Sequence, residues 1–178
     1  MKRSRVSPAG FTLTELLVTL LIIAVLAGIA YPVSMSIIAR SRSTACIAKL
    51  RDIGAALESY LQDNAHTMPN IAAGRKNKAE DVAVLDTELR PYLSPEAFHC
   101  PADHEIYEHS GCSYIWNSTQ SGRNRNSLEF FGKSGTDRRI PLVTDKEEWH
   151  PGESGVNILY ADLSASNKLR FGINNTNP

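Results

Sequence analysis

Thiol and imidazole side chains gather near the middle of the chain. Of its three cysteines, Cys100 and Cys112 flank a short loop, and Cys46 lies far ahead of them. Thiols at this spacing can form a disulfide in an oxidising compartment. Closing such a loop is worth roughly 3 kcal/mol in the chain-entropy model. We therefore predict a Cys100–Cys112 disulfide, and we interpret Cys46 as a small packing residue.

The same stretch contains side chains of the types that bind zinc. They are His99, Cys100, His104, His109 and Cys112. Their spacing matches no usual zinc pattern, and the adjacent side chains of His99 and Cys100 tend to point apart. The disulfide is therefore the favoured interpretation, with zinc as the alternative.

Acidic side chains that suit calcium lie nearer the C-terminus. They are Asp145, Glu147, Glu148, Glu153 and Asp162. No ligand-by-ligand calcium motif is visible, so a solvated acidic loop is favoured, and calcium at Asp145, Glu147 and Asp162 is the alternative. Because no nucleophile elbow, phosphate loop or metalloprotease helix is present either, we predict no catalytic residue, no enzyme activity and no required cofactor.

One acid, Glu15, stands directly before a long uncharged run. Residues 16–39 are 24 consecutive residues without a charged side chain. As a helix they would extend roughly 36 Å, enough to cross a hydrocarbon core about 30 Å thick. A carboxylate at the edge of hydrocarbon is costly, so the position of Glu15 predicts a specific role.

The charges around this run predict its orientation. Lys2, Arg3 and Arg5 precede it without an acid among them, which places the N-terminus in the cytoplasm and the bulk of the chain outside. The alternatives are a buried core helix and an ordinary signal peptide cut near Ala30. The length of the run and Glu15 argue against both.

The sequence GFTLTELLV at residues 10–18 resembles the N-terminal methylation motif of type IV prepilins and type II secretion pseudopilins. The resemblance implies that prepilin peptidase cuts between Gly10 and Phe11 and that the new amine is then methylated. It places Glu15 where the family carries its acid and Pro32 where many pilins have a proline. It also implies a structural subunit, stored in the bacterial inner membrane, that joins like subunits through its first helix in a pilus or a secretion pseudopilus.

The physical chemistry of Glu15 agrees with this role. Cleavage leaves a positive amine on Phe11, and a buried charge is tolerable only when it is paired. We expect Glu15 of one subunit to neutralise the Phe11 amine of another, which makes Glu15 an assembly residue.

Gly28 and Pro32 are expected to weaken the first helix. Pro32 removes a backbone donor and crowds the carbonyl of Gly28, and glycine adds its own conformational freedom. By the resemblance, this stretch can unwind as the subunit leaves the membrane; a simple kink is the alternative.

Helical periodicity continues beyond the membrane segment. Apolar residues recur at steps of three and four, as in an amphipathic helix that packs against a globular domain. They are Ile47, Leu50, Ile53, Leu57 and Leu61. We therefore divide the chain into a leader at 1–10, a transmembrane half-helix at 11–39, an amphipathic half-helix at 40–64 and an extracytoplasmic domain at 65–178.

The last segment predicts a small antiparallel sheet, and hence an α+β, pilin-like fold. A helix is expected over 81–93, and strands are expected at 113–117, 128–131, 140–144, 156–161 and 168–173. Pro141 suggests an edge strand. The last two strands are expected to form a hairpin across 163–167.

Net charge argues against nucleic acid as a partner. The precursor is balanced, and loss of the leader with its three basic residues leaves the mature chain at −3. A local basic patch is the alternative to a solvated loop, and its members would be Arg123, Arg125, Lys133, Arg138 and Arg139.

The C-terminal domain contains a second, weaker resemblance to prepilin-like proteins. Residues 156–162 resemble a C-terminal signature of some planctomycete and verrucomicrobial prepilin-like proteins, but the spacing from His150 to Asp162 differs and Leu163 replaces its glycine.

The mid-domain cysteine pair favours a pseudopilin over a pilin. The rival function is a membrane-tethered enzyme or binding domain that uses the first helix only as an anchor.

Overall fold

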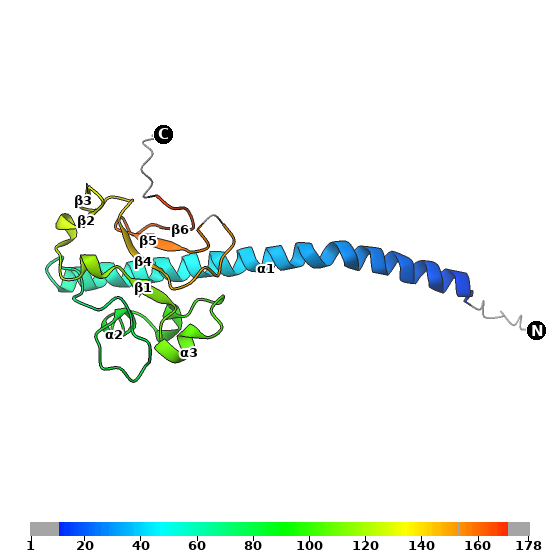
Figure 1. Cartoon of the computed structure of the whole chain (residues 1–178), viewed down its shortest axis with the longest axis horizontal. Coiled ribbons are helices and arrows are strands. Elements are labelled where there is room, and N and C mark those ends of the chain that lie inside the picture. The colour runs from blue at the N-terminus through cyan, green and yellow to red at the C-terminus, as the bar shows by residue number, and fades with distance from the viewer. Residues whose placement is uncertain (1–10, 153, 171–178) are drawn as a thin grey trace, which may run out of the picture. The chain divides into compact units, whose positions relative to one another are not determined.

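The computed structural model describes residues 11–152 and 154–170. The chain divides into two compact units, with the boundary between Ile38 and Ala39. Helix α1, Leu13–Asp63, is 51 residues long and contributes to both units (Figure 1).

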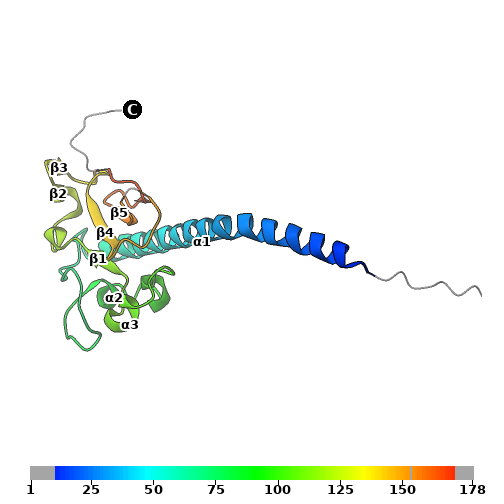
Figure 2. The ribbon, with the colours of Figure 1, turned by 45° about the vertical axis from the view of Figure 1, so that its right-hand side comes forward.

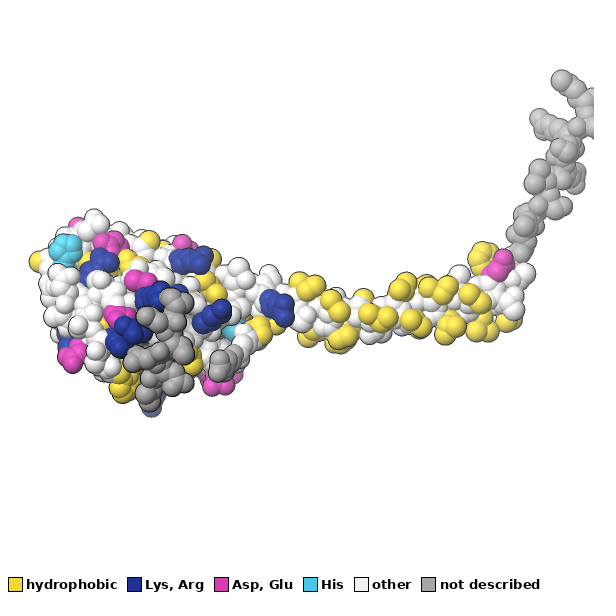
Figure 3. Space-filling model, turned by 90° about the horizontal axis from the view of Figure 1, so that it is seen from above, with side chains coloured by type: hydrophobic (Ala, Val, Ile, Leu, Met, Phe, Trp, Pro, Cys, Tyr) yellow, Lys and Arg dark blue, Asp and Glu magenta, His cyan; other side chains and the backbone are white. Residues whose placement is uncertain are grey.

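In the first unit, α1 is apolar around its whole circumference. Hydrophobic side chains cover this part of the helix (Figure 3), and none of the residues in its most apolar 18-residue window is buried. By length and composition α1 is able to cross a membrane. The uncharged run at 16–39 therefore lies within one helix and is almost entirely exposed.

In the second unit, α1 supplies one wall of the core. Leu50, Ile53, Leu57 and Leu61 are fully buried, which confirms the predicted apolar stripe. The helix ends at Asp63, within one residue of the predicted end, and left-handed backbone at Ala65 and His66 turns the chain.

A four-stranded antiparallel sheet lies against this part of α1 (Figure 2). Its strands are β1 (Tyr114–Trp116), β4 (Pro141–Asp145), β5 (Ile158–Tyr160) and β6 (Ala165–Ser166), in the order β1-β4-β5-β6. The α+β, pilin-like prediction is confirmed. Tyr114 and Trp116 share a buried face, also as predicted.

The prediction that Pro141 marks an edge strand is wrong. Strand β4 pairs with β1 on one side and with β5 on the other. Pro141 is the first residue of β4, beside a register shift, where a missing N–H disrupts little of the ladder. Its carbonyl still accepts a hydrogen bond from Asn117 Nδ2, at 2.8 Å.

The predicted C-terminal hairpin exists, but its second strand lies earlier than expected. Leu159 pairs with Ala165, and Ile158 pairs with Ser166. Ala165 and Ser166 both lie inside the segment at 163–167 that was expected to be the turn. Left-handed backbone at Leu163 makes a tighter turn than predicted. Residues 168–170 are not in a strand, and 171–173 lie outside the described residues.

The remaining elements are short. A separate hairpin joins β2 (Glu129–Phe130) to β3 (Lys133–Ser134), so the strand predicted at 128–131 exists outside the main sheet. The helix expected over 81–93 is reduced to the single turn Leu85–Glu88. Tertiary packing buries Leu85 and Leu89 without a longer helix, and the chain turns before Pro91. The short helices are α2 (Leu85–Glu88), η1 (Pro95–Phe98), α3 (Ile106–Ser110), η2 (Ser118–Gln120) and η3 (Arg125–Ser127).

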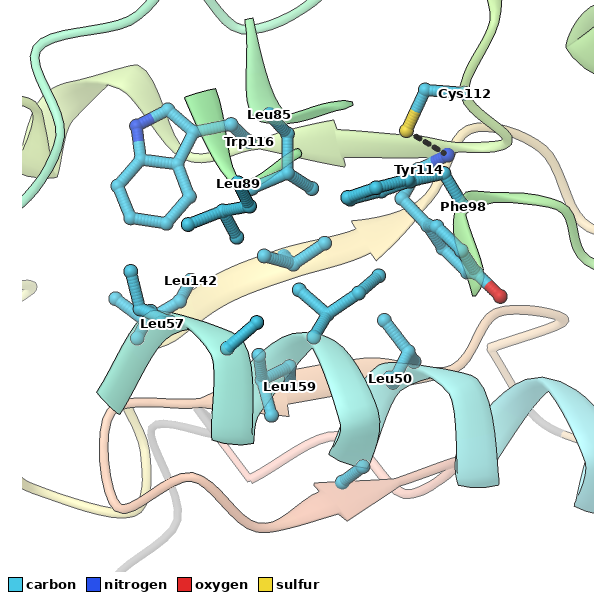
Figure 4. Close-up of a cluster of buried hydrophobic side chains, with 14 of the residues drawn as sticks. Leu50, Leu57, Leu85, Leu89, Phe98, Cys112, Tyr114, Trp116, Leu142 and Leu159 are labelled. Carbon is cyan, nitrogen blue, oxygen red and sulfur yellow. Dashed lines mark hydrogen bonds between the residues drawn. The ribbon is translucent and has the colours of Figure 1, made fainter. Parts of the chain in front are cut away.

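The core of the second unit lies between α1 and the elements around the sheet. Figure 4 shows Leu50 and Leu57 of α1 facing a layer that includes Leu142, Phe98 and Trp116. These side chains are fully buried or nearly so. Burial of large apolar side chains from both layers is the main contribution that holds the helix to the sheet.

Candidate processing and assembly site

The predicted cleavage junction lies just before α1. Gly10 lies outside the described residues, and Phe11 is the first residue described. The Phe11 side chain is 77% exposed, and one residue, Thr12, separates it from the first helical residue, Leu13. The peptide bond proposed for cleavage therefore adjoins a non-helical segment.

Glu15 and Thr12 form a reciprocal cap at the start of α1. The Glu15 carboxylate accepts hydrogen bonds from the Thr12 backbone N–H, at 2.9 Å, and from its hydroxyl, at 2.7 Å. The Glu15 N–H donates back to the Thr12 hydroxyl, at 3.3 Å. This is a capping box, and the Thr-x-x-Glu spacing could have revealed it from the sequence. The sequence reasoning instead gave Glu15 an assembly role alone.

The cap holds the Glu15 carboxylate at the positive end of the helix. The Glu15 side chain remains exposed there, and the Phe11 side chain is exposed as well. An acid fixed at this position is available to a positive charge that approaches the helix N-terminus.

Gly28 and Pro32 lie within an unbroken α1. The helix continues through Pro32, so no helix break is present in this structure. Pro32 has no N–H to donate to the Gly28 carbonyl, and a Cβ atom on Gly28 would meet nothing within 4 Å apart from the local backbone of its own helix. This glycine is therefore not required by packing in the single chain.

The structure contradicts the predicted Cys100–Cys112 disulfide. Cys100 is bonded to Cys46, with their Cα atoms 5.1 Å apart, and Cys112 is a free, buried thiol. Cys46 lies one helical turn before Leu50 on the buried face of α1, so it faces the domain. The Cys112 sulfur instead accepts a hydrogen bond from the Tyr114 N–H (Figure 4). Cys46 is thus a crosslinking residue and not only a packing one.

The histidines of the alternative zinc set do not converge. The His99 ring stacks on Tyr107, with its Nε2 3.2 Å from the Asp103 carbonyl oxygen. His104 lies 3.5 Å from an Arg42 nitrogen. His109, 71% exposed, faces Glu105. Each of these rings therefore has other neighbours, and the alternative zinc set forms no shared cluster among the residues that the structure describes.

The acids considered for calcium are also separated by their contacts. Asp145 is buried against His150. Asp162 accepts hydrogen bonds from the backbone and hydroxyl of Ser164, and Arg170 lies 3.9 Å from it. Asp145, Glu147 and Asp162 form no shared ligand cluster in the described part of the chain. Glu153 lies outside that part.

Three members of the suggested basic patch are paired with acids. Arg125 pairs with Glu58, Arg123 lies 3.8 Å from Glu129, and Arg139 binds Asp137 at 2.7 Å. These contacts reduce the positive potential available to a polyanion. They favour the solvated loop over a binding surface.

Comparison with known proteins bears on the processing site. Residues 7–31 match the family described as the prokaryotic N-terminal methylation motif. The chain carries the hallmark of type IV prepilins and pseudopilins. No curated protein and no solved structure matches the chain.

The prepilin motif covers the elements that sequence and structure both single out. The matched segment includes Gly10, Phe11, Glu15 and Gly28, and it ends one residue before Pro32. The second unit lies wholly beyond it. The match therefore supports a pilin-like precursor with a helix able to span a membrane. It does not extend to the second unit.

Proposed function

We propose that this chain is a structural subunit of a type IV filament-like machine. Prepilin peptidase cuts it after Gly10, the inner membrane stores it with its N-terminus in the cytoplasm, and like subunits take it into a pilus or secretion pseudopilus. The observation that carries this proposal is the methylation motif running directly into an exposed apolar helix. Residues 11–39 act first as an anchor and then as an assembly surface.

Glu15 supports this proposal through its fixed position. The capping box aims the carboxylate at the end of α1, where the amine of Phe11 appears after cleavage. In the apolar core of a filament, that amine and an acid from a neighbouring subunit neutralise each other. Subunits packed out of register leave both charges unpaired, so the pair selects the register.

The second unit supports an outer, folded role. The Cys46–Cys100 disulfide and the apolar stripe both tie the domain to the end of α1. An extracytoplasmic location is suited to a persistent disulfide. We assign this unit to the outside of the filament. The preference for a pseudopilin rested on a Cys100–Cys112 disulfide, and it lapses because Cys100 is bonded to Cys46.

Substitution at Glu15 tests the assembly role. Glu15→Gln retains an amide able to complete the capping box but removes the charge, whereas Glu15→Ala removes both. Both variants should be cleaved and inserted in the membrane, and both should fall at least about ten-fold in a sheared filament fraction, the effect expected for losing about 1.4 kcal/mol or more of pairing.

The outcomes separate three accounts of Glu15. Loss of assembly in both variants supports charge pairing between subunits. Normal incorporation of Glu15→Gln with loss in Glu15→Ala reduces Glu15 to a cap. Normal incorporation of both variants overturns the assembly role and favours the rival, a tethered domain that needs only an anchor.

A further inference from the structure

Three side chains with metal-binding atoms meet inside the second unit. Cys46 lies on α1, Cys100 follows η1, and His150 lies in the loop after β4. Their sulfur and ring-nitrogen atoms all lie within 4.8 Å of one another, and all three residues are buried. Segments far apart in the sequence therefore bring two sulfurs and one imidazole to a single point.

A carboxylate adjoins this cluster. His150 Nε2 lies 3.3 Å from Cys100 Sγ and 3.3 Å from Asp145 Oδ2. In a tetrahedral zinc site with standard bond lengths, neighbouring ligand atoms lie about 3.4 to 3.8 Å apart. The Cys100–His150 edge of such a tetrahedron is thus close to its required length.

His150, the adjoining Asp145 and Asn157, which donates to Asp145, each carry an unpaired buried atom among the described residues. Asp145 Oδ1, His150 Nδ1 and Asn157 Nδ2 are buried without a hydrogen-bond partner in the described part of the chain. The Asp145 carboxylate is fixed through its other oxygen, which accepts a hydrogen bond from the Asn157 N–H at 2.6 Å. A buried carboxylate with a free oxygen favours a cation beside it.

We propose that Cys46, Cys100 and His150 bind one zinc ion when the disulfide is reduced, and that the buried Asp145 carboxylate lies beside this site without binding the ion. Two thiolates and an imidazole are ligands that zinc accepts. The two thiolates neutralise the ion, which suits a buried position, and the Asn157 N–H orients the carboxylate from outside the site. This zinc set shares only Cys100 with the set considered from the sequence.

Disulfide and zinc exclude each other at this site, because they use the same sulfur electrons. Two electrons and two protons convert the disulfide to two thiols, and zinc binding then releases two protons as both sulfurs become ligands. In the opposite direction, a small disulfide oxidant accepts two electrons from the bound thiolates. The Cys46–Cys100 bond forms, the oxidant leaves as two thiolates, and zinc is released.

Metal titration of the full-length protein in detergent tests the proposal. The protein is reduced with a phosphine and titrated with zinc against a chromophoric chelator, and an air-oxidised sample is treated identically. We expect one zinc per chain in the reduced protein and at least ten-fold weaker binding in the oxidised one. Cobalt as a substitute should give the charge-transfer absorption of two thiolate ligands.

Variants identify the ligands. His150→Ala should weaken zinc binding at least ten-fold, whereas Cys112→Ser, whose thiol lies outside the cluster, should bind as the unsubstituted protein does. Because a ligand variant can fail to fold, alkylation of the unsubstituted reduced protein is also measured. Zinc should protect Cys46 and Cys100 at least ten-fold.

The proposal is overturned if the reduced unsubstituted protein binds no zinc, or if its cobalt spectrum lacks thiolate absorption. It is also overturned if Cys112→Ser loses zinc binding while zinc fails to protect Cys46 and Cys100 of the unsubstituted protein from alkylation.

Discussion

Cys46 on α1 is bonded to Cys100, 54 residues further along the chain. The bond joins the buried face of the helix to the segment after η1, and both sulfurs lie in the core cluster. A crosslink across this separation constrains the unfolded chain more than the short Cys100–Cys112 loop would.

Removal of this disulfide should strongly destabilise the second unit. Cys46→Ser and Cys100→Ser should each lower the free energy of unfolding by about 4 kcal/mol, the chain-entropy value for a loop of this length. Urea unfolding of the detergent-solubilised protein, followed by the fluorescence of Trp116, measures the change. If the unsubstituted, disulfide-bonded protein and both variants had the same free energy of unfolding, the bond would not stabilise the second unit.

Cys112→Ser provides the matched control for the disulfide prediction. It leaves the crosslink intact and replaces a buried thiol by a hydroxyl, so its cost should be about 1 to 3 kcal/mol. Under denaturing conditions without reductant, only Cys112 should react with a thiol reagent. Labelling of Cys46 or Cys100 would show that the disulfide is not formed.

Burial of Cys112 should make the protein sensitive to alkali. Burial raises the pKa of the Cys112 thiol from 9.0 to about 12. Between these values the unfolded chain loses the thiol proton and the folded chain keeps it, so stability falls as pH rises. From about pH 8 to about pH 10, this group should lower the unfolding free energy by about 1.4 kcal/mol.

The Cys112→Ala variant isolates this effect of alkali. It should lack that part of the decrease, as measured by urea unfolding at both pH values. A decrease of the same size in both proteins would assign it to other groups, such as Tyr114, whose pKa is also raised by burial.

The disulfide shows where sequence spacing is insufficient. Cys100 and Cys112 are close in the chain, but α3 and the turn at Gly111 lie between them, and Cys112 is directed toward Tyr114. The helical phase of Cys46 with Leu50 placed its thiol on the buried face, and this signal was present in the sequence. The partner was not, because it depends on how the domain packs on α1.

The strands show a similar division. Alternation in the sequence located β1, whose buried residues follow a period of two. It also located β5, although all three residues of that strand are buried. Strand order depends on long-range pairing, so Pro141 suggested an edge although β4 is central. At the N-terminus, the motif and the uncharged run predicted the candidate site because its chemistry is local.

Asp103 should be an important stabilising acid. Its carboxylate accepts hydrogen bonds from Ser113 Oγ and from the three backbone N–H groups of residues 105–107. Burial acts to raise the pKa of Asp103, but these hydrogen bonds together hold it below its usual value. The stabilisation is present above the unfolded pKa, near 4, and is lost as pH falls through the folded pKa.

Asp103→Asn should therefore cost about 1 to 3 kcal/mol at neutral pH and less in acid. Urea unfolding at about pH 7 and about pH 3 measures both values, with Asp81→Asn as an exposed control. A cost for Asp103→Asn that does not depend on pH would contradict the charged-acceptor explanation.

The buried ion pair of Arg75 and Asp86 gives a further prediction. The two side chains are 2.5 Å apart and less than a tenth exposed. Asp86→Ala should cost about 3 to 5 kcal/mol because it leaves Arg75 buried without its partner. The double variant Arg75→Met/Asp86→Leu should recover most of that loss in urea unfolding, and additive losses would show that the pair is not coupled.

The mass of the native N-terminal peptide tests the central claim most directly. The protein is isolated from cells that contain prepilin peptidase and is analysed by mass spectrometry after proteolysis. The account predicts a mature chain that begins with N-methyl-Phe11, with Glu15 as its fifth residue. A chain that retains Met1, or one that begins near Ala30, would contradict it.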